Sequence, residues 1–239
     1  MLCFNKFVKR FFDIVLCMLA LIVLSPIFAI ISIAIKCDSK GPVIFSQQRR
    51  TINGKIFKMY KFRSMVVNAE SMGAGLFNFE NDPRVTKVGR ILRVTSLDEL
   101  PQLWNVVKGD LSLVGPRPCV VYELGDFDTL NRKYKKRFEM RGGITGLAQI
   151  KGRNENSWEE KVFYDNQYID EFKKQGYWLD IKILFGTVLN VLKKQDIYEE
   201  KKDESMDDTE AAKLAEEEII RIAHLPDEDA DDEKMRVQI

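Results

Sequence analysis

An uncharged stretch near the N-terminus constrains this chain more than any other feature of its sequence. It covers residues 14–35, where Ser25, Pro26 and Ser32 interrupt an otherwise apolar run. A helix of this length, rising about 1.5 Å per residue, would just cross a hydrocarbon layer of roughly 30 Å. Pro26, however, removes a backbone hydrogen bond at the middle of the run, and Ser25 can satisfy the freed carbonyls. We therefore expect a break at Ser25-Pro26.

Both flanks of the stretch are basic, which bears on whether it crosses a membrane. A spanning helix usually has more Lys and Arg on its cytoplasmic side. Here both sides are positive: Lys6, Lys9 and Arg10 come before, and Lys36, Lys40, Arg49 and Arg50 come after. We favour a re-entrant hairpin within residues 1–40, with arms over 14–24 and 27–35, its hinge at Ser25-Pro26 and both ends cytoplasmic. A single transmembrane helix is the alternative.

The net charge of +1 hides a basic body and an acidic tail. Residues 196–239 hold 17 acidic and 6 basic side chains, whereas residues 1–195 hold 31 basic and 19 acidic ones. A basic body fits anionic partners such as phospholipid head groups or nucleotides. In the tail we expect a helix from Thr209 to Ala223 and disorder beyond it, and we assign the tail no function.

Cysteine and histidine usage excludes several kinds of site. The four cysteines show no CxxC spacing, and the single histidine, His224, lies in the acidic tail. The body therefore lacks a Ser-His-Asp or Cys-His nucleophile and a histidine-rich metal site. Any acid, base or nucleophile there must be a carboxylate, Lys, Tyr, Ser or Cys.

The pattern of the body predicts an α+β fold that is mainly helical with a small β-hairpin. Asn53-Gly54 between two β-prone runs is a strong hairpin signal, because both residues accept positive φ. Residues 84–94 form a short basic amphipathic helix, and Leu100 to Val107 form a second helix ending near Gly109. Residues 177–192 are apolar enough for a core helix or for an interfacial helix lying on a bilayer.

Asp98 and Glu99 lie between the two short helices, in the run from Ser96 to Pro101. Ser96 with Glu99 matches a capping box, in which Asp98 would merely favour the helix dipole. Pro101 strains that register, because it biases the residue before it away from the α region. An Asp at a helix start also stays ionised, and nearby arginines would attract a phosphate to it. The structural and the functional interpretation are compatible.

Two later loops carry features that suit anion binding. Arg117 stands between Pro116 and Pro118, which restrict how its guanidinium projects, and such an arginine suits bidentate recognition of phosphate. The glycines of the segment 141–146 give another tight loop, which is a weak signal alone.

Five motifs in order resemble the bacterial sugar transferase family, the monotopic phosphoglycosyl transferases. They are Lys61-Phe62-Arg63-Ser64-Met65, Ser96-Leu97-Asp98-Glu99-Leu100-Pro101-Gln102, Gly115-Pro116-Arg117-Pro118, Gly143-Ile144-Thr145-Gly146-Leu147-Ala148-Gln149 and Gly152-Arg153-Asn154. The resemblance covers about residues 6–195 and is to the small, catalytic-core form.

The resemblance implies transfer of a sugar-1-phosphate from a UDP-sugar to undecaprenyl phosphate with release of UMP, the first membrane step of surface glycan biosynthesis. It implies that Asp98 is the nucleophile of a covalent phosphosugar intermediate and that Glu99 helps to hold Mg²⁺. The phosphate-binding basic residues fall on Lys61, Arg63, Arg93 and Arg117, and the membrane hinge falls on Ser25 and Pro26. One departure is Gly142, where many members have Pro, so the loop there could be looser.

The resemblance also sets expectations for the domain organisation, the binding partners and the cellular location. We expect a re-entrant membrane segment in 1–40, a cytoplasmic catalytic domain in 41–195 and the acidic tail in 196–239. Partners would be a UDP-sugar, with an N-acetylated amino sugar preferred, undecaprenyl phosphate and membrane phospholipid, and not nucleic acid; a homodimer is left open. The place would be the cytoplasmic face of a bacterial inner membrane. The alternatives are a membrane-anchored glycosyltransferase that releases UDP and a non-catalytic scaffold.

Overall fold

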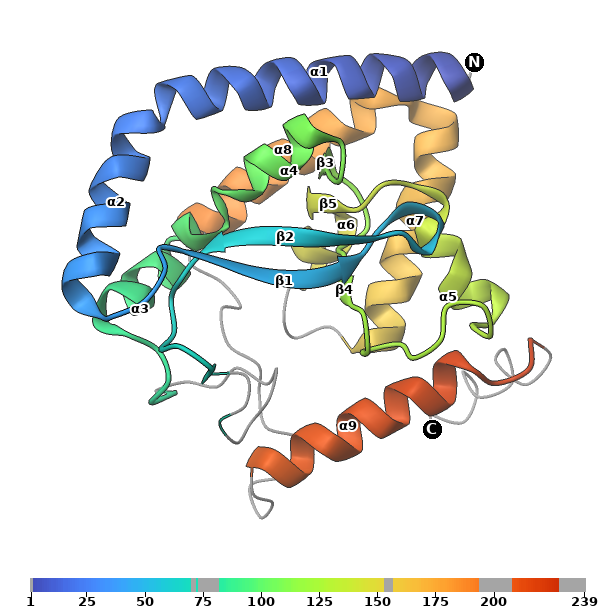
Figure 1. Cartoon of the computed structure of the whole chain (residues 1–239). Helices are drawn as coiled ribbons and strands as arrows, with labels where there is room; N and C mark the ends of the chain where they lie inside the picture. Colours follow the sequence, from blue (N-terminus) through green and yellow to red (C-terminus); the bar gives the residue numbers. More distant parts are fainter. Residues whose placement is uncertain (1, 70–71, 73–81, 153–156, 194–207, 228–239) are drawn as a thin grey trace.

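Helices surround two small sheets in this protein (Figure 1). The structure, a computed structural model, describes residues 2–69, 72, 82–152, 157–193 and 208–227. Its helices are α1 (Leu2–Val23), α2 (Ser25–Asp38), α3 (Lys87–Val94), α4 (Gln102–Lys108), α5 (Arg132–Lys136), α6 (Leu147–Lys151), α7 (Trp158–Gln175), α8 (Tyr177–Lys193) and α9 (Asp208–Ala223). Its strands are β1 (Ile44–Arg50), β2 (Ile56–Phe62), β3 (Ser112–Val114), β4 (Cys119–Val120) and β5 (Gly143–Thr145). The expected α+β class, mainly helical, is confirmed.

The N-terminal helices α1 and α2 meet at the expected break. Pro26 has no N–H to give to the carbonyl four residues earlier, that of Ile22, and the Ser25 hydroxyl donates to this carbonyl at 2.8 Å. The chain bends by 61° there. No single helix in the described ranges is long and apolar enough to cross a membrane, whereas α1 and α2 pass that test together as a bent pair.

The first arm is longer than expected. It was predicted to begin at residue 14, but α1 begins at Leu2 and carries the charged residues Lys9, Arg10 and Asp13. Lys9 and Asp13 are buried against the body, where the Lys9 amine donates to the Asp180 carboxylate at 2.6 Å and to the Val114 carbonyl at 2.8 Å. The charged residues therefore lie inside α1, where they bind it to the rest of the protein, and they do not end the helix.

The predicted β-hairpin is confirmed. Strands β1 and β2 pair antiparallel from Ile44 opposite Phe62 to Arg50 opposite Ile56, and Asn53 and Gly54 turn with φ of 55° and 73°. The sequence pattern did not reveal β4, which adds to the other edge of β1, or the parallel pair β3–β5. On the free edge of β2, the Asn105 side chain of α4 accepts from the Tyr60 N–H at 2.9 Å and donates to the Lys58 carbonyl at 2.8 Å. Asn105 thus fixes α4 to the sheet.

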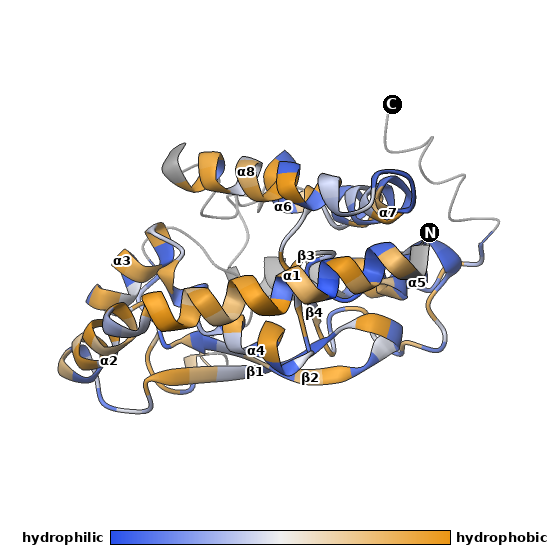
Figure 2. Ribbon diagram, turned by 90° about the horizontal axis from the view of Figure 1, so that it is seen from above, coloured by the Kyte–Doolittle hydropathy of each residue, from blue (hydrophilic) through white to orange (hydrophobic). Residues whose placement is uncertain are grey.

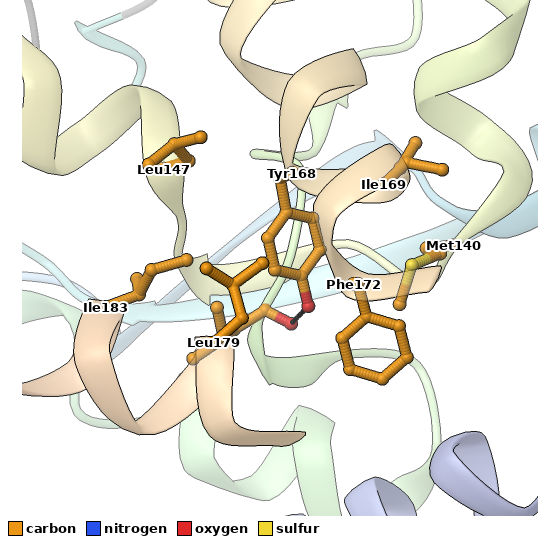
Figure 3. Close-up of a cluster of buried hydrophobic side chains, with 8 residues drawn as sticks. Met140, Leu147, Tyr168, Ile169, Phe172, Leu179 and Ile183 are labelled. Carbon is orange, nitrogen blue, oxygen red and sulfur yellow. Dashed lines mark hydrogen bonds between the residues drawn. The ribbon is translucent and has the colours of Figure 1, made fainter. Parts of the chain in front are cut away.

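A cluster of buried apolar side chains joins α6, α7 and α8 to β3 (Figure 3). Tyr168 lies at its centre, and its hydroxyl donates to the Asp180 carboxylate at 2.8 Å and to the Val114 carbonyl at 3.3 Å. The cluster consists of Val114, Met140, Leu147, Tyr168, Ile169, Phe172, Leu179 and Ile183. Two other clusters attach the N-terminal helices: Cys17 of α1 packs with β2 and α4, and Ile31 and Ile35 of α2 pack with β2 and α3.

The tail contains the expected helix, α9. Ala223 is fully buried, and Ile219 and Ile222 pack against a cluster that includes Leu124, Tyr134 and Phe138. The His224 ring contacts the Leu124 carbonyl at 2.9 Å. The predicted disorder at the end of the tail lies outside the described residues.

Candidate active site

Asp98 and Glu99 lie in a 3-10 helix, Leu97–Glu99, between α3 and α4. The capping box that the sequence suggested does not form. Ser96 has φ of 56° and ψ of 16°, in the left-handed region, and its side chain makes no capping hydrogen bond. An N-cap residue normally has β-region angles, so this backbone cannot present the Ser96 hydroxyl in the usual way. The Glu99 side chain is consequently directed elsewhere.

Glu99 accepts two cations on a single carboxylate oxygen. Its Oε1 lies 2.9 Å from the Lys61 Nζ of β2 and 2.7 Å from the Arg117 Nη2 of the loop between β3 and β4. Burial alone would raise the pKa of Glu99, but Arg117 and Lys61 outweigh it and hold that pKa well below its ordinary value. Glu99 is therefore ionised at neutral pH and draws three separate parts of the chain together.

Asp98 has a different environment, although it is the next residue. Its side chain is buried, with 8% of the residue exposed, and no hydrogen bond or ion pair is found for its carboxylate within the described part of the chain. Burial raises the pKa of Asp98, an effect that Lys61 opposes and Glu99 reinforces; Arg93 and Arg117 also oppose it. The Asp98 carboxylate thus lies among cations without being neutralised by direct contact with one.

The structure brings Arg93 to this cluster but not Arg63. The Arg93 Nε donates to the Ser64 hydroxyl at 3.0 Å, and its charge acts on Asp98. Arg63 is buried, and its guanidinium donates to three carbonyls at the end of α2: Ile35 at 3.4 Å, Ser39 at 2.8 Å, and Lys40. Its placement does not support the predicted phosphate-binding role, because its donors are directed at the C-terminal carbonyls of a helix.

The loop that carries Arg117 is held by residues that the sequence analysis missed. The Arg137 Nη2 donates to the Arg117 carbonyl at 2.8 Å, and the Arg49 Nη1 donates to the Pro118 carbonyl at 2.9 Å. Arg137 in turn forms an ion pair with Asp165 of α7 at 2.8 Å. No local sequence signal relates these residues to Arg117, since the separations range from 20 to 69 positions.

The loop at Gly142 is ordered by contacts to its neighbours. The Gly142 N–H donates to the Thr51 hydroxyl at 3.0 Å, and the Gly142 carbonyl accepts from the Ser112 N–H at 2.8 Å. A proline here would have no N–H for Thr51. Gly142 therefore supplies a hydrogen bond that a proline could not make, and the looser loop stays a prediction. Part of the neighbouring motif, Arg153 and Asn154, lies outside the described residues.

Asp98 and Glu99 fit a Mg²⁺ site in which the phosphates of the substrate supply further ligands. No group of three or more Asp, Glu, His or Cys side chains in the described ranges could hold a metal by itself. Mg²⁺ is, however, commonly held by one or two carboxylates together with substrate phosphates. Asp98 and Glu99 supply two carboxylates, and Glu99 uses only Oε1 for Lys61 and Arg117.

The arrangement as a whole can hold an anionic substrate next to a carboxylate. Lys61 and Arg117 are only partly buried, with side chains 20% and 41% exposed, so both can reach a ligand. The cations offset the repulsion between the Asp98 carboxylate and a phosphate group, and hydrogen bonds from Arg or Lys orient phosphate oxygens. The chemistry that this favours is attack of a carboxylate on phosphorus.

Comparison with known proteins agrees with this geometry. The family model for bacterial sugar transferases matches residues 4–194. The chain is 41% identical, over 81% of its length, to an undecaprenyl-phosphate galactose phosphotransferase of Salmonella typhimurium, and 47% identical, over 77%, to a UDP-glucose:undecaprenyl-phosphate glucose-1-phosphate transferase of Klebsiella pneumoniae. It covers 42% and 40% of these two relatives.

A shorter relative is matched over most of its own length. The chain is 44% identical to an uncharacterized sugar transferase, EpsL, of Bacillus subtilis, over 79% of this chain and 89% of the relative. The family match covers both carboxylates, the lysine and arginines beside them, and the α1–α2 pair. The chain belongs to the bacterial sugar transferase family.

Proposed function

We propose that this protein transfers a sugar-1-phosphate from a UDP-sugar to undecaprenyl phosphate and releases UMP. The observation that carries the proposal is the contrast between adjacent carboxylates: Glu99 is held by Lys61 and Arg117, whereas Asp98 lies beside them without a direct partner. In such a pair, Glu99 holds the surrounding cations in place and Asp98 is available to react. The names of the two relatives describe the same class of transfer.

The proposed mechanism has two displacements at one phosphorus atom. First, an Asp98 carboxylate oxygen attacks the phosphorus that bears the sugar; an O–P bond forms, the bond to the bridging diphosphate oxygen breaks, and UMP leaves with that electron pair. Second, a phosphate oxygen of undecaprenyl phosphate attacks the same phosphorus. This forms the lipid diphosphate sugar and returns the Asp98 carboxylate.

The remaining site residues act on charge and position. Lys61 and Arg117 bind the phosphate oxygens and hold Glu99, and Arg93 adds positive charge on the Asp98 side. Mg²⁺, held by Glu99 together with the diphosphate, would neutralise charge on the leaving UMP. Phosphoryl transfer is catalysed mostly by positioning the substrate and neutralising its charge. It therefore does not require a histidine, and residues 1–195 contain none.

The donor sugar is proposed from two sources that differ. The sequence resemblance favours an N-acetylated amino sugar, whereas the names of the two relatives specify glucose and galactose. Because these relatives are 41% and 47% identical to the chain, we rank UDP-galactose and UDP-glucose first as donors to be tested.

We further propose that α1 and α2 form a re-entrant membrane hairpin and that α8 lies at the interface. In Figure 2 these three helices are hydrophobic over much of their length. Their outward side chains include Phe7, 70% exposed, Ile33, 65%, and Phe185, 67%. Covering one such side chain with lipid gains roughly 1–2 kcal/mol, so a set of them favours membrane contact strongly. The basic flanks would keep both ends on the cytoplasmic face of a bacterial inner membrane.

The domain limits and partners follow from the same proposal. Residues 1–40 would be the membrane segment, residues 41–195 the cytoplasmic catalytic domain, and residues 196–239 a tail whose helix α9 packs on that domain. Membrane phospholipid would surround the hairpin. A homodimer stays a prediction that the contacts within one chain do not test.

The protein in detergent should release UMP from the correct UDP-sugar over many turnovers only when Mg²⁺ and undecaprenyl phosphate are both present; without the lipid, it should release at most one UMP per protein molecule, as Asp98 takes up the phosphosugar. Asp98→Asn should lower this release at least about 1,000-fold, because an amide oxygen is a poor nucleophile for phosphorus. The matched control Asp128→Asn changes an exposed aspartate and should retain activity within about twofold. A panel containing UDP-glucose, UDP-galactose and their N-acetylated counterparts identifies the donor.

The nucleotide product separates the alternatives. A glycosyltransferase would release UDP instead of UMP, and a scaffold would show no turnover with any donor. Undiminished UMP release by Asp98→Asn would overturn the assignment of the nucleophile while leaving phosphosugar transfer in place.

The pH dependence tests the charge around Asp98. In the wild type, kcat/KM should rise with pH as Asp98 loses its proton, with a midpoint above the ordinary aspartate pKa because burial raises it. Lys61 lowers the pKa of Asp98, so Lys61→Gln should move this acidic limb to higher pH. Lys58→Gln, on the same strand with an exposed side chain, should leave the limb in place. A limb that stays or moves to lower pH in Lys61→Gln would contradict the proposal.

Thiol labelling in a bacterial host tests the hairpin. An impermeant maleimide added to intact spheroplasts should label neither Cys3 nor Cys37, because both would face the cytoplasm, and it should label Cys37 after lysis, since this side chain is exposed. Cys17 and Cys119 are buried and serve as internal controls. A spanning helix would instead make one of Cys3 and Cys37 reactive in intact spheroplasts.

A further inference from the structure

Two arginines hold the main chain of the Arg117 loop from different sides. Arg49 belongs to β1 and donates to the carbonyl of Pro118 at 2.9 Å. Arg137 follows α5 and donates to the carbonyl of Arg117 itself at 2.8 Å. The two carbonyls belong to successive peptide units, the first of which follows the Arg117 Cα, and each unit is held by one hydrogen bond.

Arg137 is an unusual residue for a purely structural position. Its side chain is 3% exposed, and its charge is balanced by Asp165 of α7, 2% exposed, at 2.8 Å. Its guanidinium also lies over the Trp158 ring, 5.0 Å from the centroid. Burying such a pair costs several kcal/mol in desolvation, and an apolar pair of similar volume often stabilises a protein as well or better. The buried pair therefore contributes little that stability alone requires, whereas the Arg137 Nη2 lies against Asp165 and also donates to the Arg117 carbonyl, which fixes the direction of that carbonyl.

The Arg117 side chain depends on this support. It is 41% exposed, and its guanidinium contacts Glu99 through its Nη2 at 2.7 Å. A long side chain near solvent loses rotamer freedom when it holds one position. Fixing its Cα and carbonyl in advance limits how far the guanidinium can move, and displacement of a catalytic group by about 1 Å can cost about 100-fold in rate. The rings of Pro116 and Pro118 restrict the torsions of the loop. The Pro116 carbonyl also accepts from the Gly143 N–H of β5 at 2.9 Å, but the carbonyl of Arg117 itself is held by Arg137.

We propose that Arg137, paired with Asp165, and Arg49 are positioning residues that fix the main chain at residues 117–118 so that Arg117 meets Glu99 and the substrate phosphate. This inference rests on the phosphosugar transfer proposed above. It adds to that proposal three residues that act through the main chain at residues 117–118.

A double-mutant cycle distinguishes positioning from general stability. Arg137→Lys keeps a positive charge near Asp165 but removes the Nη2 group that also donates to the Arg117 carbonyl. In the wild-type background it should lower kcat for UMP release about 10- to 100-fold, with a smaller change in KM for the UDP-sugar. In an Arg117→Ala background the same change should cost less than about threefold, because the side chain that it positions is gone. Radiolabelled donor keeps slow variants measurable.

The matched control breaks another ion pair between the same parts of the fold. Lys136 and Asp170 join α5 to α7 at 2.7 Å without a hydrogen bond to the 117–118 loop. Asp170→Asn should keep kcat within about twofold. If Arg137→Lys does not fold, as judged by thermal unfolding, Arg49→Lys takes its place in the cycle, because it loosens the Pro118 carbonyl without disturbing Asp165.

The outcomes are separable. Equal losses from Arg137→Lys, or from Arg49→Lys, in the presence and absence of the Arg117 side chain would overturn the positioning role. A folded wild type that releases no UMP from any donor in the panel would instead contradict the proposed function and remove the basis of the inference. A loss confined to the background that retains Arg117 supports it.

Discussion

One carboxylate oxygen, Oε1 of Glu99, receives Lys61 and Arg117 at 2.9 and 2.7 Å, and the arrangement of the site depends on this contact. Lys61 comes from β2, Arg117 from the loop after β3, and Glu99 from the 3-10 helix between α3 and α4. Because the two cations keep Glu99 ionised, the neighbouring Asp98 is left in a positive environment without a direct partner. The division of roles between the two carboxylates follows from that sharing.

Residues at the end of β2 and just after it connect the site to the apolar N-terminal helices. Lys61 reaches Glu99, and two positions later the Arg63 guanidinium holds the carbonyl end of α2. At the other end of the N-terminal pair, Lys9 fastens α1 to Asp180 and to the carbonyl of Val114 at the end of β3, close in sequence to Arg117. If the hairpin enters the lipid as proposed, these two attachments set the depth of the site, so that the phosphate of a lipid substrate can reach it without leaving the bilayer.

Sequence reasoning succeeded where the physical cause is local. Asn53-Gly54 accepts the positive φ of a tight turn, Gly109 ends α4 in the left-handed region, and Pro26 frees a carbonyl that Ser25 then satisfies. It failed where distant residues decide. The capping box at Ser96 was plausible locally, but Glu99 has stronger partners 38 and 18 positions away. Arg63 looked like part of a basic motif until the end of α2 was placed against it, and the parallel pairing of β3 with β5 has no local signal. The candidate carboxylates could thus be named in advance, but their surroundings could not.

If Asp98 becomes covalently attached to the phosphosugar, as proposed, that species can be trapped. Protein incubated with Mg²⁺ and a UDP-sugar labelled with ³²P in the sugar-bearing phosphate, without undecaprenyl phosphate, should retain the label after denaturation. Hydroxylamine should release the label as expected for an acyl phosphate, peptide mapping should locate it at Asp98, and Asp98→Asn should not retain it. Retention of label by Asp98→Asn, or no labelling of an enzyme that turns over normally once the lipid is added, would exclude Asp98 as the nucleophile.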